Sequence, residues 1–375
     1  MAVALRVGGY EQKSAWFPSA IPLDRLLRGK RSRPLPFPGS AAILTAISAD
    51  ETPPLPGGSE RLRFECMAYR QNSILLLLSM VLFHLISFPA FVLASSGDLS
   101  LSVPVFDSTI TLQARAKFAG AVSSLVFRGK EHIDSLDHGR LLQSASSFDG
   151  YGECYNPTEG GASHESQNEN VSVLKAARVE GNQLWTLVDM GFWLNPGQAY
   201  PNGCGTRKTL TQAINTEPTS GHLLEKRLTV GLPGFPNVIE HQVTFYVPTN
   251  FSSATFEAST GYIPKEFSRA LYYDAEHGTE IDPGNRQGEQ AFPVILATPD
   301  NFYAIGVYSP QLPKNGMGYG RFSFPDVNKW NCVFREDNVK HANQYNYQCL
   351  IILGTLNEVE DTLRRLDKTY GHISH

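Results

Sequence analysis

Hydrophobic and polar residues alternate along most of the chain after residue 94, with the two-residue period of β-strands. Turn-forming residues, such as those of Gly231–Gly234 and Pro299–Asn301, separate the alternating segments. The segments that alternate, or are rich in β-branched and aromatic residues, are Thr109–Lys117, Val122–Phe127, Leu184–Val188, Leu223–Val230, Val238–Val247, Ala291–Ala297, Tyr303–Tyr308 and Gln348–Leu353. This pattern predicts an all-β fold built from many antiparallel strands.

One segment near the C-terminus has the period of a helix instead. Leu356, Val359, Leu363 and Leu366 would lie on one face of a helix over about residues 357–369. The sequence shows neither alternating strand–helix units nor a repeat of fixed length, which disfavours Rossmann folds, TIM barrels and propellers. We therefore expect residues 95–375 to form a single large antiparallel β-sandwich with one C-terminal helix.

A third pattern precedes the strands. Residues 71–94 contain no Lys, Arg, Asp or Glu, and Ile74–Ala94 is apolar almost throughout. We interpret residues 67–94 as a signal peptide cleaved after Ala94 or, because the apolar run is long, as an uncleaved signal-anchor helix. Residues 1–70 hold ten Lys and Arg against six Asp and Glu, so the positive-inside rule places residues 95–375 outside the cytosol in both cases.

Residues 1–66 are rich in Pro, Arg, Ser and Gly and have no sustained period. They suit a disordered cytosolic tail, an N-terminal extension mis-annotated upstream of a true start at Met67, or an organelle transit peptide. We favour the start at Met67. The net charge of −4 over the whole chain provides no basic field for nucleic acid, and a membrane contact is expected only through residues 74–94.

Four cysteines follow the apolar segment, and their spacing matches no zinc site. An even number behind a secretory signal predicts disulfides. The segments around Cys332 and Cys349 both have strand character, and a hairpin between them would place these two cysteines opposite each other, which leaves Cys154 to pair with Cys204. Two glycosylation sequons, at Asn170 and Asn250, lie in the same region.

Polar residues and glycines are concentrated in Asp137–Gly161, and aromatic residues lie among them. Sugar hydroxyls require amide, carboxylate and guanidinium partners, and the C–H face of a sugar ring packs on a flat aromatic ring. The alternative is a loop that is held by Cys154 and whose polar groups bond the backbone. The candidates in this block are His138 and Arg140 with Glu153 for catalysis, and Gln143, Tyr151, Tyr155, Asn156 and Glu159 for substrate binding.

Two later blocks add candidates. Glu289 and Gln290 precede an expected strand, where a catalytic carboxylate would be held rigidly, although an ordinary loop acid is equally compatible. Tyr319, Arg321 and Trp330 follow in a glycine- and aromatic-rich segment, with Trp330 as either a core residue or part of an apolar wall. We expect His138, Arg140, Glu153 and Glu289 to converge on one concave surface. No motif for a metal, nucleotide or other cofactor is present.

One segment carries a family resemblance. The run from Phe118 through Gly120-Ala121 to Gly129-Lys130-Glu131, followed by Asp137–Arg140, resembles the opening of galactose mutarotase-like proteins. Together with the later GECYNPTE run it is also similar to uncharacterised secreted microbial proteins. The resemblance implies a β-supersandwich of the kind found in aldose epimerases and in domains of glycoside hydrolases and polysaccharide lyases, with the loop after Glu131 lining a sugar site.

Three functions remain after these observations. The first is a secreted or membrane-anchored carbohydrate-active enzyme of hydrolase, lyase or epimerase type, which needs an acid, a base and a cation at one site. The second is a glycan-binding sandwich without a positioned acid–base pair. The third is an anchored adhesion or structural domain without a deep cleft. The expected partner of the first two is a carbohydrate.

Overall fold

The computed structural model describes residues 97–136, 139–161, 171–311 and 317–371. The expectations for residues 1–66 and for the apolar segment 67–94 therefore lie outside the described residues. Over the ranges described, no helix combines the length and the apolar character needed to cross a membrane.

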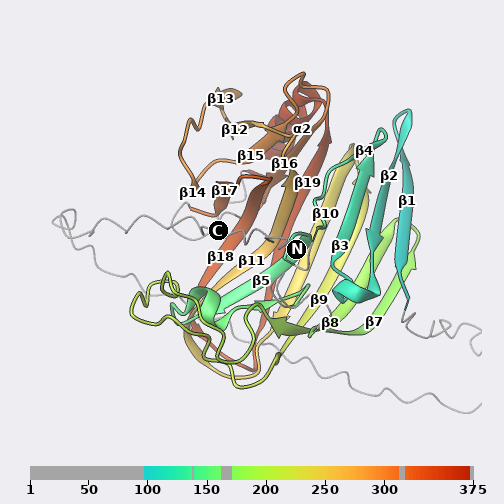
Figure 1. The fold of residues 1–375 in the computed structure, drawn as a ribbon. Coiled ribbons are helices and arrows are strands. Elements are labelled where there is room, and N and C mark those ends of the chain that lie inside the picture. The colour runs from blue at the N-terminus through green and yellow to red at the C-terminus, as the bar shows by residue number, and fades with distance from the viewer. Residues whose placement is uncertain (1–96, 137–138, 162–170, 312–316, 372–375) are drawn as a thin grey trace, which may run out of the picture. The chain divides into compact units, whose positions relative to one another are not determined.

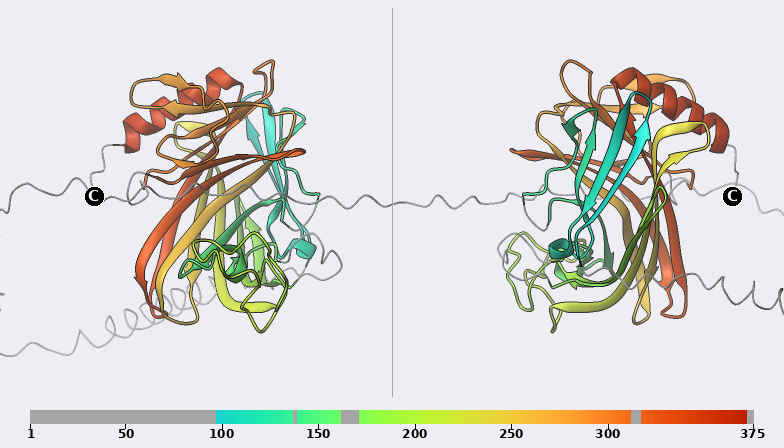
Figure 2. Two further views of the ribbon diagram at one scale, coloured as in Figure 1. Left: turned by 60° about the vertical axis from the view of Figure 1, so that its left-hand side comes forward. Right: turned by 90° about the vertical axis from the view of Figure 1, so that its right-hand side faces the viewer.

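Two antiparallel sheets face each other, as the two layers in Figures 1 and 2 show. In sheet 1 each strand pairs with the next one in the order in which the following sentence names them. Sheet 1 consists of β1 (Leu99–Val105), β2 (Ser108–Ala114), β3 (Val122–Phe127), β5 (Leu142–Phe148), β11 (Phe251–Pro264), β18 (Val327–Val339), β17 (Tyr319–Ser323) and β14 (Gly288–Gln290).

Sheet 2 is built in the same antiparallel way. It consists of β7 (Val173–Glu180), β8 (Gln183–Phe192), β9 (Thr219–Leu232), β10 (Phe235–Tyr246), β19 (Gln344–Gly354), β16 (Ala304–Tyr308), β15 (Val294–Ala297), β12 (Arg269–Asp274) and β13 (Thr279–Ile281). The short strand β6 (Pro157–Thr158) pairs with β5 and with β8, and so links the two sheets at one end. Three further short elements are β4 (Lys130–Glu131), η2 (Ala116–Phe118) and η3 (Gly152–Tyr155).

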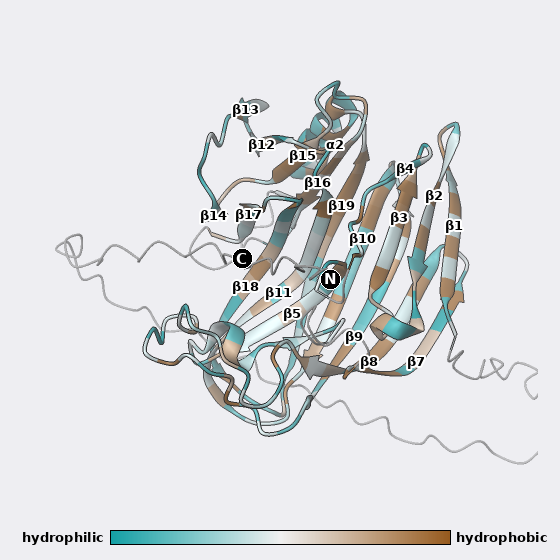
Figure 3. Cartoon of the chain, in the orientation of Figure 1, coloured by the Kyte–Doolittle hydropathy of each residue, from teal (hydrophilic) through white to brown (hydrophobic). Residues whose placement is uncertain are grey.

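The main core lies between the sheets, where the inward-facing apolar residues of both layers pack together. Figure 3 shows hydrophobic and hydrophilic residues alternating along the strands of sheet 1. Helix α2 (Leu356–Tyr370) packs its apolar residues Val359, Leu363 and Leu366 on the outer face of sheet 2. The helix thus covers the outer face of sheet 2 and not the outer face of sheet 1.

The expected fold class is confirmed: the chain forms a large antiparallel β-sandwich, with one α-helix at the C-terminal end of the described residues. The helix begins and ends within one residue of its predicted bounds. Its start is fixed by a capping box formed by Thr355 and Glu358. Two strand predictions need correction. Residues 116–118 form the helical turn η2 rather than the end of a strand, and β15 begins only at Val294, directly after Pro293.

Both predicted disulfides are present, Cys154–Cys204 and Cys332–Cys349. The reason given for the second pair was wrong, however. Strands β18 and β19 do not form the expected hairpin: β18 pairs with β11 and β17 in sheet 1, and β19 pairs with β10 and β16 in sheet 2. The Cys332–Cys349 bond therefore crosses the core and ties the two sheets together.

Candidate functional site

The outer face of sheet 1 carries a cluster of charged side chains in the middle of the sheet. Along β18 the side chains of Trp330, Cys332 and Phe334 enter the core, so Lys329 and Arg335 lie on the opposite, outer face. Strand β11 lies beside β18 with Tyr262 opposite Lys329 and Thr260 opposite Asn331. Because residues directly opposite each other in a sheet share a face, the two strands together form a polar surface.

Glu257 and Lys329 form an ion pair at the centre of this surface, with 3.2 Å between Oε2 and Nζ. The carboxylate also accepts a hydrogen bond of 2.7 Å from the Thr260 hydroxyl. Burial by itself would raise the pKa of Glu257, but Lys329 and hydrogen bonds from Thr260 and Asn331 outweigh it and lower the pKa. For Lys329 the effects are reversed. Burial by itself would lower the pKa of the lysine, but the neighbouring Glu257 outweighs burial and raises the pKa.

The pKa values of Glu153 and Glu289 are shifted in the opposite direction from that of Glu257. Burial raises the pKa of both carboxyls, and the nearby cations only partly offset it. Glu153 accepts a hydrogen bond of 3.1 Å from the Asn156 amide, and Glu289 pairs with Arg335 at 2.6 Å. Both interact electrostatically with Glu257 and Lys329. Three carboxyl groups from three distant segments therefore interact electrostatically with one lysine.

Two aromatic rings flank the same lysine. The Nζ atom of Lys329 lies 5.4 Å from the centre of the Tyr262 ring and 5.5 Å from the centre of the Phe322 ring. Both rings are partly exposed. Charged groups between partly exposed rings provide hydrogen-bonding partners and flat apolar surfaces at one place.

A glycine makes room for one of the polar side chains. A Cβ atom at Gly320 would lie 1.9 Å from the side-chain oxygen of Asn331, so the amide occupies the space that a larger residue would fill. Asn331 is 3% exposed, and its side-chain oxygen has no hydrogen-bond partner among the described residues. A buried acceptor of this kind, beside Glu257, is a group that a ligand could satisfy.

The structure brings together several of the residues expected at the site. Glu153, Asn156 and Glu289 lie in the cluster, and Gln143 is in register with Thr260 on the adjacent strand β5. Arg140 forms ion pairs with Asp134 and Asp326. His138 lies outside the described residues. The catalytic roles of all these residues remain predictions.

Other expected site residues lie elsewhere. Trp330 and Tyr319 are buried in the core, so they do not form the apolar wall of the outer face. Tyr155 packs against Phe192 at 4.8 Å, within an aromatic group at one end of the sandwich. Glu159 is fully buried and pairs with Lys226.

The remaining three candidates are held by local contacts. Tyr151 lies under the guanidinium of Arg207, at 4.2 Å from the ring centre. Gln290 bonds backbone groups of Phe292 and Tyr319. Arg321 lies on the opposite side of β17 from Gly320 and Phe322, because side chains alternate along a strand.

The candidates named from the sequence did not include Glu257, Thr260, Tyr262, Phe322, Lys329 or Asn331. Tyr262 and Glu257 lie on β11, which was not among the predicted strands. The alternation of KWNCVFR, with its apolar residues at Trp330, Cys332 and Phe334, was a signal that could have placed Lys329 on the polar face.

Two further expectations concern modification and metal. Asn170 lies outside the described residues, while Asn250 is exposed and accepts a hydrogen bond of 3.0 Å from the backbone of His341. Glycosylation at both sites remains a prediction. Over the described ranges, His, Cys, Asp and Glu side chains form no group that could hold a metal ion.

No protein-family model matches the chain, and no curated protein matches it. Three solved structures with a similar arrangement are the Slr1438 protein from Synechocystis sp. PCC 6803, the GH36 alpha-galactosidase AgaB from Geobacillus stearothermophilus and the heparan sulfate lyase HepC from Pedobacter heparinus. Their TM-scores are 0.39, 0.40 and 0.36, at 10%, 8% and 8% identity.

The aligned regions cover 72%, 70% and 71% of this chain, in the same order. They cover 99% of the Slr1438 protein, but only 41% of the alpha-galactosidase and 37% of the lyase. The chain thus spans less than half the length of these two enzymes.

Proposed function

We propose that this chain is a carbohydrate-active protein, and that it is an enzyme acting on a sugar or polysaccharide at the outer face of sheet 1. One observation carries the proposal: Glu257 pairs with Lys329 beside the rings of Tyr262 and Phe322, and Glu153 and Glu289, whose pKa values are shifted in the opposite direction from that of Glu257, interact electrostatically with this pair. Neighbouring titratable groups with divergent pKa values are typical of acid–base sites.

The three carboxyl groups suit different roles. Glu257, with its lowered pKa, is ionised at neutral pH and can accept a proton from a sugar. Glu153 and Glu289, with raised pKa values, are better suited to donate one. Lys329 can stabilise negative charge that develops on a sugar oxygen. The rings of Tyr262 and Phe322 offer surfaces for the C–H face of the sugar.

A non-catalytic glycan-binding role is the second candidate. The observation that favours it is that Glu257 and Glu289 already form ion pairs, with Lys329 and Arg335. Such pairs hold the carboxylates rigidly and leave lone pairs for sugar hydroxyls, without requiring a proton transfer. A protein of this kind would bind glycans but release no product.

The experiment is a screen of the full chain against reducing sugars and uronic-acid polysaccharides, in which new reducing ends and the absorbance of unsaturated products are followed. We expect Glu257→Gln to lower turnover by about 10²–10⁴-fold, since it removes the proposed base but keeps a hydrogen-bonding group. Glu180→Gln, at an exposed carboxylate on β7, is the matched control and should leave turnover unchanged. Equal activity of both variants would contradict the assignment of Glu257, and binding without product would favour the second candidate.

We also propose that residues 95–375 act outside the cytosol, because the basic flank precedes the apolar segment and two disulfides follow it. In intact microsomes these residues should resist added protease until detergent is present. Digestion without detergent would overturn this location. Sequencing of the protected fragment then separates the two alternatives, since an N-terminus near Ser95 indicates a cleaved signal and retention of residues 74–94 indicates an anchor.

A further inference from the structure

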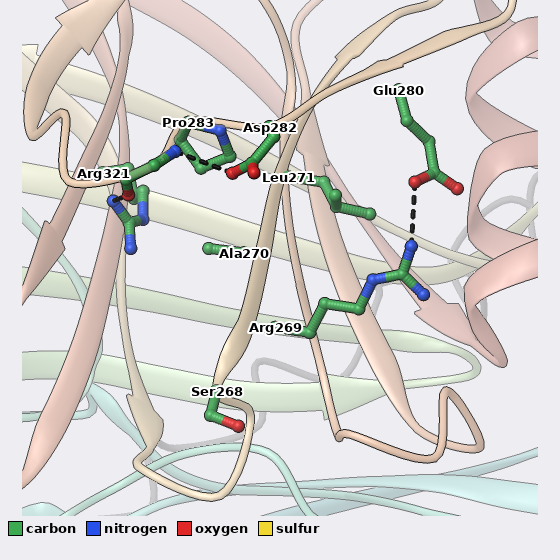
Figure 4. A pocket seen from close by; sticks show the side chains of 9 residues that line it. Ser268, Arg269, Ala270, Leu271, Glu280, Asp282, Pro283 and Arg321 are labelled. Atoms are coloured by element: carbon green, nitrogen blue, oxygen red, sulfur yellow. Dashed lines mark hydrogen bonds and ion pairs between the residues drawn. The ribbon is translucent and has the colours of Figure 1, made fainter.

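A second polar surface lies at the edge of the sandwich, in a groove with a volume of 460 Å³. Arg269, Ala270 and Leu271 of strand β12 line it together with the segment 282–284 (Figure 4). Arg321 lies at one end of the groove, and Arg269 with Glu280 lies at the other. A volume of this size falls within the range of small-ligand sites, which is about 300–1,000 Å³.

The charged groups in the groove are balanced and are already held by protein partners. Arg269 pairs with Glu280 at 2.8 Å, and Arg321 donates a hydrogen bond of 2.7 Å to the backbone oxygen of Arg286. Asp282 accepts a hydrogen bond of 2.7 Å from the backbone of Gly284. With two cations and two anions, the groove favours a neutral ligand over a strongly charged one.

The chemistry of the lining fits a ligand rich in hydroxyl groups. Arg269 also donates a hydrogen bond of 2.7 Å to the side-chain oxygen of Asn301, and Arg321 donates a second, longer one of 3.4 Å to the backbone oxygen of Gly284. A carboxylate offers about four acceptor positions and a guanidinium five donors, so each group keeps capacity beyond these bonds. Ala270, Leu271 and Pro283 add apolar surface between the charged ends. Donors, acceptors and apolar surface in one groove are what a sugar ring requires, as on the outer face of sheet 1.

Strand β17 connects the groove to the outer face. Gly320 and Phe322 face the cluster around Lys329, and Arg321, the residue between them, reaches the groove from the other side of the strand. Glu289 lies on β14, which pairs with β17 at the same edge and is separated by only three residues from the segment 282–284 that lines the groove. The two surfaces are therefore separated by the edge strands of sheet 1.

We infer that the carbohydrate taken by this protein is an extended glycan, which lies on the outer face of sheet 1 and passes over the β14–β17 edge, so that further sugar residues occupy the groove. This inference rests on the proposed function, because it assumes that the outer face binds sugar. It adds the substrate class: an oligosaccharide or polysaccharide rather than a monosaccharide.

The test compares binding of di-, tetra- and hexasaccharides of the galacto-, gluco- and galacturono- series to the full chain by calorimetry. For the series that binds, the hexasaccharide should bind about ten times more tightly than the disaccharide, as one or two additional hydrogen bonds provide. Ser268→Trp places a large side chain in the groove at an exposed position and should remove this gain while leaving disaccharide binding unchanged. Ser268→Phe should give the same result.

The control is Glu180→Trp, at an exposed residue at the end of β7 in sheet 2, which should keep the gain with length. Equal binding of all lengths to the unaltered chain, or an unchanged gain in both Ser268 variants, would overturn the inference and leave the proposed function standing. Absence of binding to every saccharide would overturn the proposed function, and the inference with it.

Discussion

Replacement of Lys226 by methionine should lower the free energy of unfolding by about 3–5 kcal/mol, the largest effect expected of a single substitution in this chain. Lys226 on β9 and Glu159, which follows β6, are both completely buried and form an ion pair inside the sandwich. Lys226 also donates a hydrogen bond of 3.0 Å to the backbone oxygen of Gly120. Loss of the lysine leaves the Glu159 carboxylate buried without its counter-charge, which is the costly situation.

Denaturant unfolding measures the effect, and a double variant tests its cause. Lys226→Met combined with Glu159→Gln removes both charges but keeps an acceptor for the backbone of Ser144, which now bonds Glu159 at 3.1 Å. The double variant should therefore be more stable than Lys226→Met alone, although it removes more of the native groups. Lys175→Met, which breaks the more exposed Lys175–Asp189 pair, is the control and should cost less than about 1 kcal/mol. A similarly small effect of Lys226→Met would contradict the prediction.

Stability should also fall as the pH is lowered from about 6.5 to about 4, because burial lowers the pKa of three histidines, His132, His222 and His241. Burial lowers the pKa of both His132 and His222 from 6.5 to about 4. Between these values the unfolded chain binds protons that the folded chain cannot, so each histidine can remove about 3 kcal/mol of stability. For His132 and His222 the loss stops growing below about pH 4, where both states are protonated. His241, whose pKa burial lowers well below 6.5, acts in the same direction. Above pH 6.5 neither state is charged and the stability is complete.

The contribution of one histidine can be isolated by substitution. His222 lies among aromatic rings, at 4.8 Å from Phe148 and stacked on Phe251 at 5.9 Å, so phenylalanine fits the same surroundings. His222→Phe should reduce the loss of stability between pH 6.5 and 4, measured by denaturant unfolding at each pH, while His341→Gln at an exposed position should not. Comparison of variants is needed because Glu360 acts in the opposite direction: burial beside Glu280 raises its pKa to about 7, which favours the folded state as the pH falls. An unchanged pH profile for His222→Phe would contradict this account.

The pattern of hydrophobic and polar residues alone could not show that the residues of these two predictions are buried. Glu159 stands in a polar, glycine-rich segment, and its sequence surroundings indicated a solvent-accessible binding residue. Its burial depends on Lys226, which is 67 residues away, on β9 of sheet 2. An ion pair between distant segments leaves no periodic signal in either of them, since each residue is an isolated charge in its own strand or loop.

The sequence by itself determined the fold class and the C-terminal helix. Both disulfide pairs were named from the sequence, but on the basis of a hairpin that β18 and β19 do not form. Two-residue alternation and turn residues are local properties, and so is the capping box of Thr355 and Glu358 that begins the helix. Glu153 and Glu289 could also be proposed from local context, as acids beside glycines and strand ends.

Only the tertiary structure decided which sheet each strand joins and which polar residues meet. It placed β18 and β19 in different sheets, so that Cys332–Cys349 crosses the core instead of joining a hairpin. It brought Glu257 on β11 and Lys329 on β18 together with Glu153 and Glu289. The physical reason is that strand pairing between residues far apart in sequence depends on how the whole set of apolar faces packs, and period alone does not specify the neighbour of a strand.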